Sequence, residues 1–229
     1  MFKDASQLAQ VIDHTLVRPD ATLDDLAAAC ADAKKYGFAC VVVNSSYAAF
    51  ARELLSGTLV KVCSVVGFPH GANTTTVKIV EAMEAMKNGA SELDIVINIG
   101  MMKSGRFEVV EIDIKNIIAM TPQKVHKVII ETGSLTPDEI ARASQIAAGA
   151  GAEFIKTSTG YGPRGVTAED VRLIRREIGS SCRIKASGGI KDLAAATAMI
   201  EAGAERIGTS AGPAIMEEYL KKSGQVLPL

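Results

Sequence analysis

The amino-acid sequence predicts an α/β fold of the TIM-barrel type, a parallel (β/α)8 barrel preceded by a short N-terminal helix. Short apolar stretches alternate with helical patterns along the chain, which is typical of a parallel sheet with crossover helices. The 229 residues correspond to eight units of about 29 residues, near the size of the βα units of such barrels. A helix-ending glycine, an alanine, an acid and a strand also recur together, in segments 88–97, 150–158 and 202–210. We therefore expect one domain over residues 1–229.

The apolar stretches predict eight strand ends. These ends fall near Leu16, Val43, Val66, Val96, Ile130, Thr157, Ala186 and Thr209. The helical stretches between and after them cover residues 22–37, 46–57, 74–89, 106–120, 136–149, 167–179, 191–203 and 210–224. Several begin with Thr, Ser or Asp, which suit an N-cap, and end at a glycine, which suits a left-handed C-cap. A doubly wound open sheet is the alternative, but DHTLVRPD stands where that fold usually has a G-x-G-x-x-G turn.

Composition argues against several classes of partner. A net charge of −1, a pI near 6.3 and 4% aromatic residues do not suit nucleic-acid binding or a basic membrane face. The four cysteines form no C-x-x-C pair, which favours reduced thiols in a cytoplasmic protein over a zinc site or disulfides. The first fifteen residues form an amphipathic segment with acids, so we expect neither a signal peptide nor a membrane span.

Two lysines stand at predicted strand ends, where burial of a cation needs a partner or a chemical purpose. Lys156 lies in FIKTSTG and Lys185 in KASGGI, and both are followed by small residues. Alternation along the strands turns Leu93, Ile95 and Ile97 toward the helices and Asp94 into the barrel. The same alternation turns both lysines inward, at the end of the barrel where TIM-barrel active sites lie.

A structural ion network is the simpler interpretation of this cluster, because buried ion pairs are common without catalysis. With two lysines and one acid, however, a positive excess remains unless one amine loses its proton. Perturbed titrating groups concentrate at functional sites, so we favour a lysine that reacts as a neutral amine.

Small residues after the seventh and eighth strands suggest an anion site. Ser187, Gly188 and Gly189 follow the seventh strand, and the run 208–210 follows the eighth. Glycines allow backbone N–H groups to approach a phosphate, which commonly binds at these two loops of a TIM barrel. A pair of glycines that only shapes a tight turn is the alternative.

The motifs resemble those of the class I deoxyribose-phosphate aldolase family over essentially the whole chain. They are DHT (13–15), LDIVIN (93–98), FIKTSTG (154–160), KASGGI (185–190) and IGTSAG (207–212). The resemblance implies a TIM barrel that reversibly cleaves 2-deoxy-D-ribose 5-phosphate into D-glyceraldehyde 3-phosphate and acetaldehyde, without metal or cofactor. It implies that Lys156 forms the Schiff base and that Asp94 and Lys185 relay protons. The substrate- and phosphate-binding residues that we expect are Asp13, Thr15, Thr159, Gly160, Ser187, Gly188, Gly189, Gly208, Thr209 and Ser210.

Three positions depart from the family pattern. Tyr161 stands where some members carry a lysine that helps to hold phosphate, and Ala211 stands where some carry a second serine. We expect weaker phosphate binding, or binding that depends more on backbone groups and Lys191. The chain ends in LPL rather than in the tyrosine of some members, which puts proton transfer by the tail in doubt.

Two other classes of function stay open from the sequence. One is another phosphosugar-handling barrel, such as an isomerase or a transaldolase-like enzyme, and the other is an inactive phosphometabolite-binding protein. His14, His70 and His126 do not form a metal-binding set, because His126 begins the fifth strand, at the opposite end of the barrel. The family resemblance implies a homodimer or homotetramer with phosphosugar and aldehyde substrates.

Overall fold

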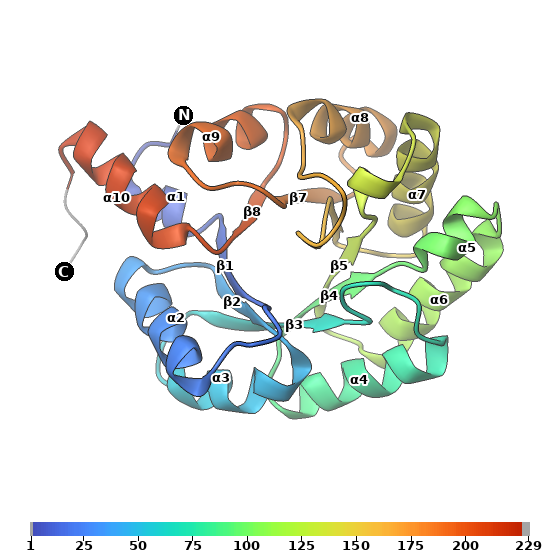
Figure 1. Ribbon diagram of the computed structural model, residues 1–229, viewed down its shortest axis with the longest axis horizontal. Coiled ribbons are helices and arrows are strands. Elements are labelled where there is room, and N and C mark those ends of the chain that lie inside the picture. Colours follow the sequence, from blue (N-terminus) through green and yellow to red (C-terminus); the bar gives the residue numbers. More distant parts are fainter. Residues whose placement is uncertain (1, 226–229) are drawn as a thin grey trace.

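The computed structural model describes residues 2–225, and its eight parallel strands close into a barrel surrounded by helices (Figure 1). The strands are β1 (Ile12–Leu16), β2 (Cys40–Val43), β3 (Lys61–Val66), β4 (Glu92–Val96), β5 (Val125–Ile129), β6 (Phe154–Lys156), β7 (Arg183–Ser187) and β8 (Arg206–Thr209). They follow chain order round the barrel, and β1 pairs with β8 to close it. The predicted TIM barrel is therefore confirmed.

The helices alternate with these strands. They are α1 (Ala5–Ala9), α2 (Leu23–Tyr36), α3 (Ala48–Leu54), α4 (Thr75–Lys87), α5 (Ile99–Lys103), α6 (Phe107–Met120), α7 (Pro137–Gly149), α8 (Ala168–Ile178), α9 (Leu193–Glu201) and α10 (Gly212–Ser223), with 3-10 helices η1 (Ser45–Tyr47) and η2 (Thr132–Ser134). The expected short N-terminal helix is α1, which packs against α10 beside the C-terminal end of the described chain (Figure 1).

Local capping explains where several helices begin and end. Thr22 and Asp25 form a capping box at the start of α2, and α7 and α8 begin in the same way. Gly37 ends α2 in the left-handed conformation, with φ of 72°, as the sequence predicts for a C-cap glycine.

The strand boundaries agree closely with the prediction, and the loops hold the differences. The predicted ends of β5, β6 and β7 each miss the observed end by one residue, and the other five agree. Helix α5 and both 3-10 helices were not expected. Helix α5 forms because the side chain of Asn98 accepts a hydrogen bond from the N–H of Met101 and caps a single short turn after β4.

The predicted alternation of strand faces is confirmed. Leu93, Ile95, Ile155 and Ile184 belong to the apolar core that includes side chains of the surrounding helices. Their inward-facing neighbours point into the barrel, where a smaller apolar cluster around β2 and β3 borders the charged side chains. No helix within residues 2–225 combines the length and the hydropathy that a membrane crossing requires.

Candidate active site

One carboxylate joins the two lysines that the sequence singles out. Oδ2 of Asp94 lies 2.7 Å from Nζ of Lys156 and 2.7 Å from Nζ of Lys185. The three side chains come from β4, β6 and β7, and all three are buried. Lys156 and Lys185 are paired in the register of β6 and β7, which brings both ammonium groups to the same carboxylate oxygen. The predicted convergence of these residues is therefore observed.

The surroundings give the two lysines opposite protonation preferences. Burial, together with the neighbouring Lys185, lowers the pKa of Lys156 below its usual 10.5, against the attraction of Asp94. Burial alone would also lower the pKa of Lys185, but attraction by Asp13 and Asp94 raises it above its usual value. Of this pair, Lys156 is the amine that loses its proton more easily.

The carboxylate of Asp94 is kept ionised by its cationic neighbours. Burial alone would raise the pKa of Asp94, but Lys127, Lys156 and Lys185 together hold it well below 3.8. Nζ of Lys127 lies 2.9 Å from Oδ1 of Asp94, on the side of the carboxylate away from the other two amines. Asp94 is therefore present as the anion across the whole neutral pH range.

The interior of the barrel holds a closed ring of alternating charges, which we call the buried charge ring. Its six members each contact two oppositely charged neighbours within the ring. In order they are Glu92, Lys127, Asp94, Lys185, Asp13 and Arg206. The links range from 2.6 Å to 3.3 Å, with the Asp13 contact of Arg206 measured at Nε. Five of the six side chains are buried, and that of Arg206 is 13% exposed.

The ring corrects the charge count expected from the sequence. The sequence predicts two lysines and one acid, whereas the structure adds Glu92, Lys127 and Arg206 and brings in Asp13. Three carboxylates and three cations balance within the ring, and Lys156, attached to it through Asp94, is a fourth cation. The predicted positive excess therefore remains, and it amounts to one charge.

Glu92, Lys127 and Arg206 were not predicted, although strand alternation in the sequence indicates that they face inward. Glu92 lies two positions before Asp94 on β4 and therefore shares its inward face, and Lys127 pairs with Asp94 in the register of β4 and β5. Arg206 lies two positions before Gly208 on β8, again on the inward face. Applying the alternation to every strand would have found all three.

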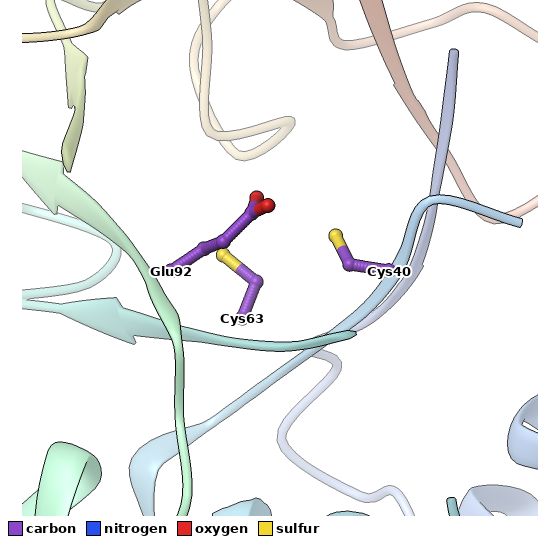
Figure 2. Close-up of side chains that lie close together, drawn as sticks. All are labelled: Cys40, Cys63 and Glu92. Carbon is purple, nitrogen blue, oxygen red and sulfur yellow. The ribbon is translucent and has the colours of Figure 1, made fainter. Parts of the chain in front are cut away.

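Two cysteines lie beside the ring, and together with Glu92 they resemble a metal-binding site. Figure 2 shows Cys40, Cys63 and Glu92 pointing toward one another from β2, β3 and β4, with ligand atoms within 4.8 Å of one another. Nζ of Lys127 already lies 3.2 Å from Sγ of Cys63, and Nη2 of Arg206 lies 3.5 Å from Sγ of Cys40. Burial raises the pKa of the Cys40 thiol well above 9, which disfavours the thiolate that a metal needs. The three residues are better understood as part of the ion network.

A cavity of about 490 Å³ opens above Lys156 at the carboxyl ends of β1, β6, β7 and β8. Besides Lys156, the predicted site residues that line it are Thr15, Thr159, Gly160, Ser187, Gly188, Gly189, Gly208, Thr209 and Ser210. The volume suits a small metabolite. The structure thus brings most of the predicted binding residues to one space beside Lys156.

Asp13 departs from its expected place. It does not line the cavity, and its carboxylate is fully buried between Lys185 and Arg206. Burial opposes ionisation, but these cations and Lys127 hold the pKa of Asp13 well below 3.8. The structure therefore places Asp13 beneath the site, where it holds Lys185, rather than against a bound ligand.

Several hydroxyl groups at the cavity wall are already used to shape the loops. The hydroxyl of Thr159 donates to the buried carboxylate of Glu131, that of Ser187 donates to the carbonyl of Ser158, and that of Thr209 donates to the carbonyl of Ile190. Gly188 and Gly189 have φ of 95° and 83°, in the region that favours glycine. The loop backbone, rather than these hydroxyls, is therefore the best source of donors to an anion.

Gly208 has a separate role that concerns Lys185. A Cβ atom at this position would lie 3.0 Å from Cε of Lys185 and 2.9 Å from Cβ of Ser187. Glycine thus leaves room for the Lys185 side chain directly under the cavity floor.

Tyr161 forms part of the rim, at the position where the sequence departs from the family pattern. Its hydroxyl donates to the carbonyl of Val17 across the opening at 3.2 Å, and its ring meets Phe68 edge-on. Lys191 also lines the cavity and supplies a cation near the glycine loop. The LPL end lies in residues 226–229, outside the described residues.

The histidines do not come together. His14 faces outward from β1 against Phe38, and His126 contacts Thr121 and Glu153 near the start of β5, whereas His70 is exposed in the loop after β3. The prediction that they do not form a joint site agrees with this placement.

Comparisons with known proteins point to one family. The model of the DeoC/LacD family aldolases matches residues 7–218. Proteins named deoxyribose-phosphate aldolase from Caldanaerobacter subterraneus and Methanothermobacter thermautotrophicus are 49% and 53% identical, over 94% and 93% of this chain and 94% and 95% of their own. A solved deoxyribose phosphate aldolase from Aeropyrum pernix, described as tetrameric, is 32% identical with a TM-score of 0.89, over 95% of this chain and 93% of that one.

Proposed function

Since this chain belongs to the DeoC/LacD family of aldolases, we propose that Lys156 is the nucleophile with which it reversibly cleaves 2-deoxy-D-ribose 5-phosphate. The products are D-glyceraldehyde 3-phosphate and acetaldehyde. The family resemblance noted in the sequence is confirmed by the matches. The observation that carries the proposal is the position of Lys156. This residue lies at the cavity wall, and burial lowers the pKa of its amine.

The lysine must react as the free amine. An ordinary lysine with a pKa near 10.4 is only about 0.1% neutral at pH 7, and a pKa near 7 needs a shift of about 3 units, or about 4 kcal/mol. Burial in a site with a surplus of one positive charge acts in this direction. Because Lys156 alone among the four cations lines the cavity, it is the one that can attack an aldehyde.

The reaction then moves one positive charge between two nitrogens. Lys156 adds to C1 of the open-chain sugar, and loss of water from the carbinolamine gives a cationic imine at that nitrogen. If Lys185 supplies the proton that leaves with this water, it becomes neutral as Lys156 becomes cationic. The total charge of the buried groups is thereby unchanged, which avoids an unpaired charge in the interior.

Cleavage reverses this transfer. As the C2–C3 bond breaks, its electron pair moves toward the imine nitrogen to give a neutral enamine of acetaldehyde, and the C3 hydroxyl gives up its proton to Lys185. Asp94, 2.7 Å from both nitrogens, holds them in position throughout, and because Lys185 does not line the cavity, its proton would reach the substrate through a water molecule. Protonation of the enamine at C2 and addition of water to the imine then release acetaldehyde and restore Lys156.

The phosphate group is proposed to bind at the loops after β7 and β8. Gly188, Gly189 and Ser210 line the cavity on that side, and Lys191 adds a cation. The phosphate would bind far from the bond that breaks, so these contacts would act by positioning the substrate. Thr15 and Gly160 complete the proposed contacts from the loops after β1 and β6.

Borohydride trapping tests the role of Lys156. With acetaldehyde and borohydride, we expect a reduced two-carbon adduct on Lys156 by peptide mass spectrometry, and we expect Lys156→Ala to lose cleavage by at least about a thousandfold while remaining folded. Unchanged turnover in Lys156→Ala, or an adduct on another residue only, would contradict the proposal and favour an isomerase or a binding protein.

Tyr161 offers a test of the phosphate site. We expect Tyr161→Lys to lower KM for 2-deoxy-D-ribose 5-phosphate by about fivefold, since one partly solvated charged contact contributes roughly 1 kcal/mol. KM for unphosphorylated 2-deoxyribose should not fall, and Tyr161→Phe, which removes only the contact with Val17, is the matched control. Equal changes for both sugars would show that the phosphate does not lie near this residue.

Self-association and a cytoplasmic location belong to the same proposal. A relative is described as tetrameric, and helix α4 of this chain exposes Val77, Val80 and Met83, which a second copy could cover. We propose a homodimer or homotetramer. Sedimentation velocity should therefore give two or four times 24.1 kDa, and a species of one chain mass at micromolar concentration would contradict this.

A further inference from the structure

No member of the buried charge ring lines the cavity, and half of the ring contacts neither Lys156 nor any group that the chemistry described above uses except through Asp94 and Asp13. This half consists of Glu92, Lys127 and Arg206, which we call the lower arc. Residues that only fill the barrel interior could be apolar, and apolar replacements of buried ion pairs are often as stable as the pairs themselves. Filling the barrel interior therefore does not explain why these three residues are charged.

The lower arc completes the balance of the ring. Without it, Asp13 and Asp94 would face Lys185 and Lys156, and both lysines would be held as cations by one carboxylate each. The lower arc adds two cations and one carboxylate, so that Lys156 becomes the surplus charge. In a buried site a surplus charge is expensive, and Lys156 is the cation that loses its proton, because Asp94 is its only carboxylate partner among the described residues, whereas each cation of the ring has at least two.

The strands of the barrel supply the groups that enter this balance. Besides the ring members, the thiols of Cys40 and Cys63 face the same interior from β2 and β3. Lys61 approaches Glu92 to 3.6 Å from the outside, but its side chain is 55% exposed, so solvent screens its charge. The ring and Lys156 thus account for the ion-paired charge around Asp94, while the buried carboxylate of Glu131, after β5, lies outside the ring and accepts hydrogen bonds from the N–H and hydroxyl of Thr159.

We propose that Glu92, Lys127 and Arg206 are positioning residues that close the buried charge ring and so leave Lys156 as the one surplus cation, poised to react as a neutral amine. They touch neither substrate nor reacting atoms and act through Asp94 and Asp13. This inference rests on the proposed role of Lys156 as the nucleophile.

Opposite changes of charge in the lower arc should move the pH dependence of imine formation in opposite directions. Lys127→Met removes a cation, so the ammonium form of Lys156 becomes the partner that Asp94 needs, and the acid limb should shift up by about one pH unit or more. Glu92→Gln removes an anion of nearly the same shape, so the surplus grows and the limb should shift down by a similar amount. The double variant restores the balance and should return the limb toward that of the unmodified protein.

The measurement is the rate of borohydride-trapped adduct formation on Lys156 with acetaldehyde between pH 5 and 10, made on the full-length protein. Thermal unfolding of each variant reports structural damage separately. Lys78→Met is the matched control, because Lys78 is a buried lysine paired with Asp113 at 2.6 Å outside the ring. It should lower the unfolding temperature and leave the acid limb unshifted.

The possible outcomes separate this inference from the proposed function. Absence of an adduct on Lys156 at every pH and saturating aldehyde would contradict the nucleophile itself. An adduct whose acid limb stays in place in Glu92→Gln, or moves in the same direction in both single variants, would overturn the inference while the nucleophile stands. If Lys127→Met does not fold, the isosteric Glu92→Gln still decides, because a downward shift supports the inference and an unshifted limb contradicts it.

Discussion

The contact on which the rest of the site depends is the one between Asp94 and three ammonium groups. One oxygen of this carboxylate serves Lys156 and Lys185, and the other serves Lys127. In the interior of a protein these charges cannot be screened by water, so their numbers must match. Within the ring, three carboxylates balance three cations. Lys156, which contacts the ring through Asp94 and lines the cavity, is the one cation of the site without a matching carboxylate among the described residues. The proposed reactivity of Lys156 therefore depends on the whole barrel interior rather than on a single neighbour.

The barrel is well suited to hold such an arrangement. Its strands contribute alternate side chains to the interior, and the register aligns Asp94 with Lys127 and Lys156 with Lys185 on neighbouring strands. A small loop-based site could not keep six charged groups within contact distance without solvent. The carboxyl ends of the strands add the glycine loops, so that one face carries both the amine of Lys156 and the proposed phosphate-binding loops.

Much of this could be predicted from the sequence, because the period of two along a strand shows which residues face inward. The apolar stretches predict the strand ends, and the period of two, together with the common carboxyl edge of the strands, predicts that Asp94, Lys156 and Lys185 meet. The family resemblance implies that Asp13 lies near the substrate, but a motif match does not show how deep a residue lies, and the structure places Asp13 below Lys185. The contact between Arg206 and Glu92 was not predicted, because the alternation was applied to neither residue. Loop hydroxyls such as Thr159 and Thr209 suggested phosphate ligands, yet their bonds to neighbouring loop groups depend on three-dimensional approach.

The most direct test of the account is a site-resolved titration of the buried lysines by ¹⁵N NMR at Nζ. Lys156 should lose its proton first, with a pKa below 10.5, while the Nζ groups of Lys127 and Lys185 remain protonated beyond that pH. A Lys156 that keeps its proton until after either of the other two has lost its own would contradict the claim that the ring leaves it as the surplus cation.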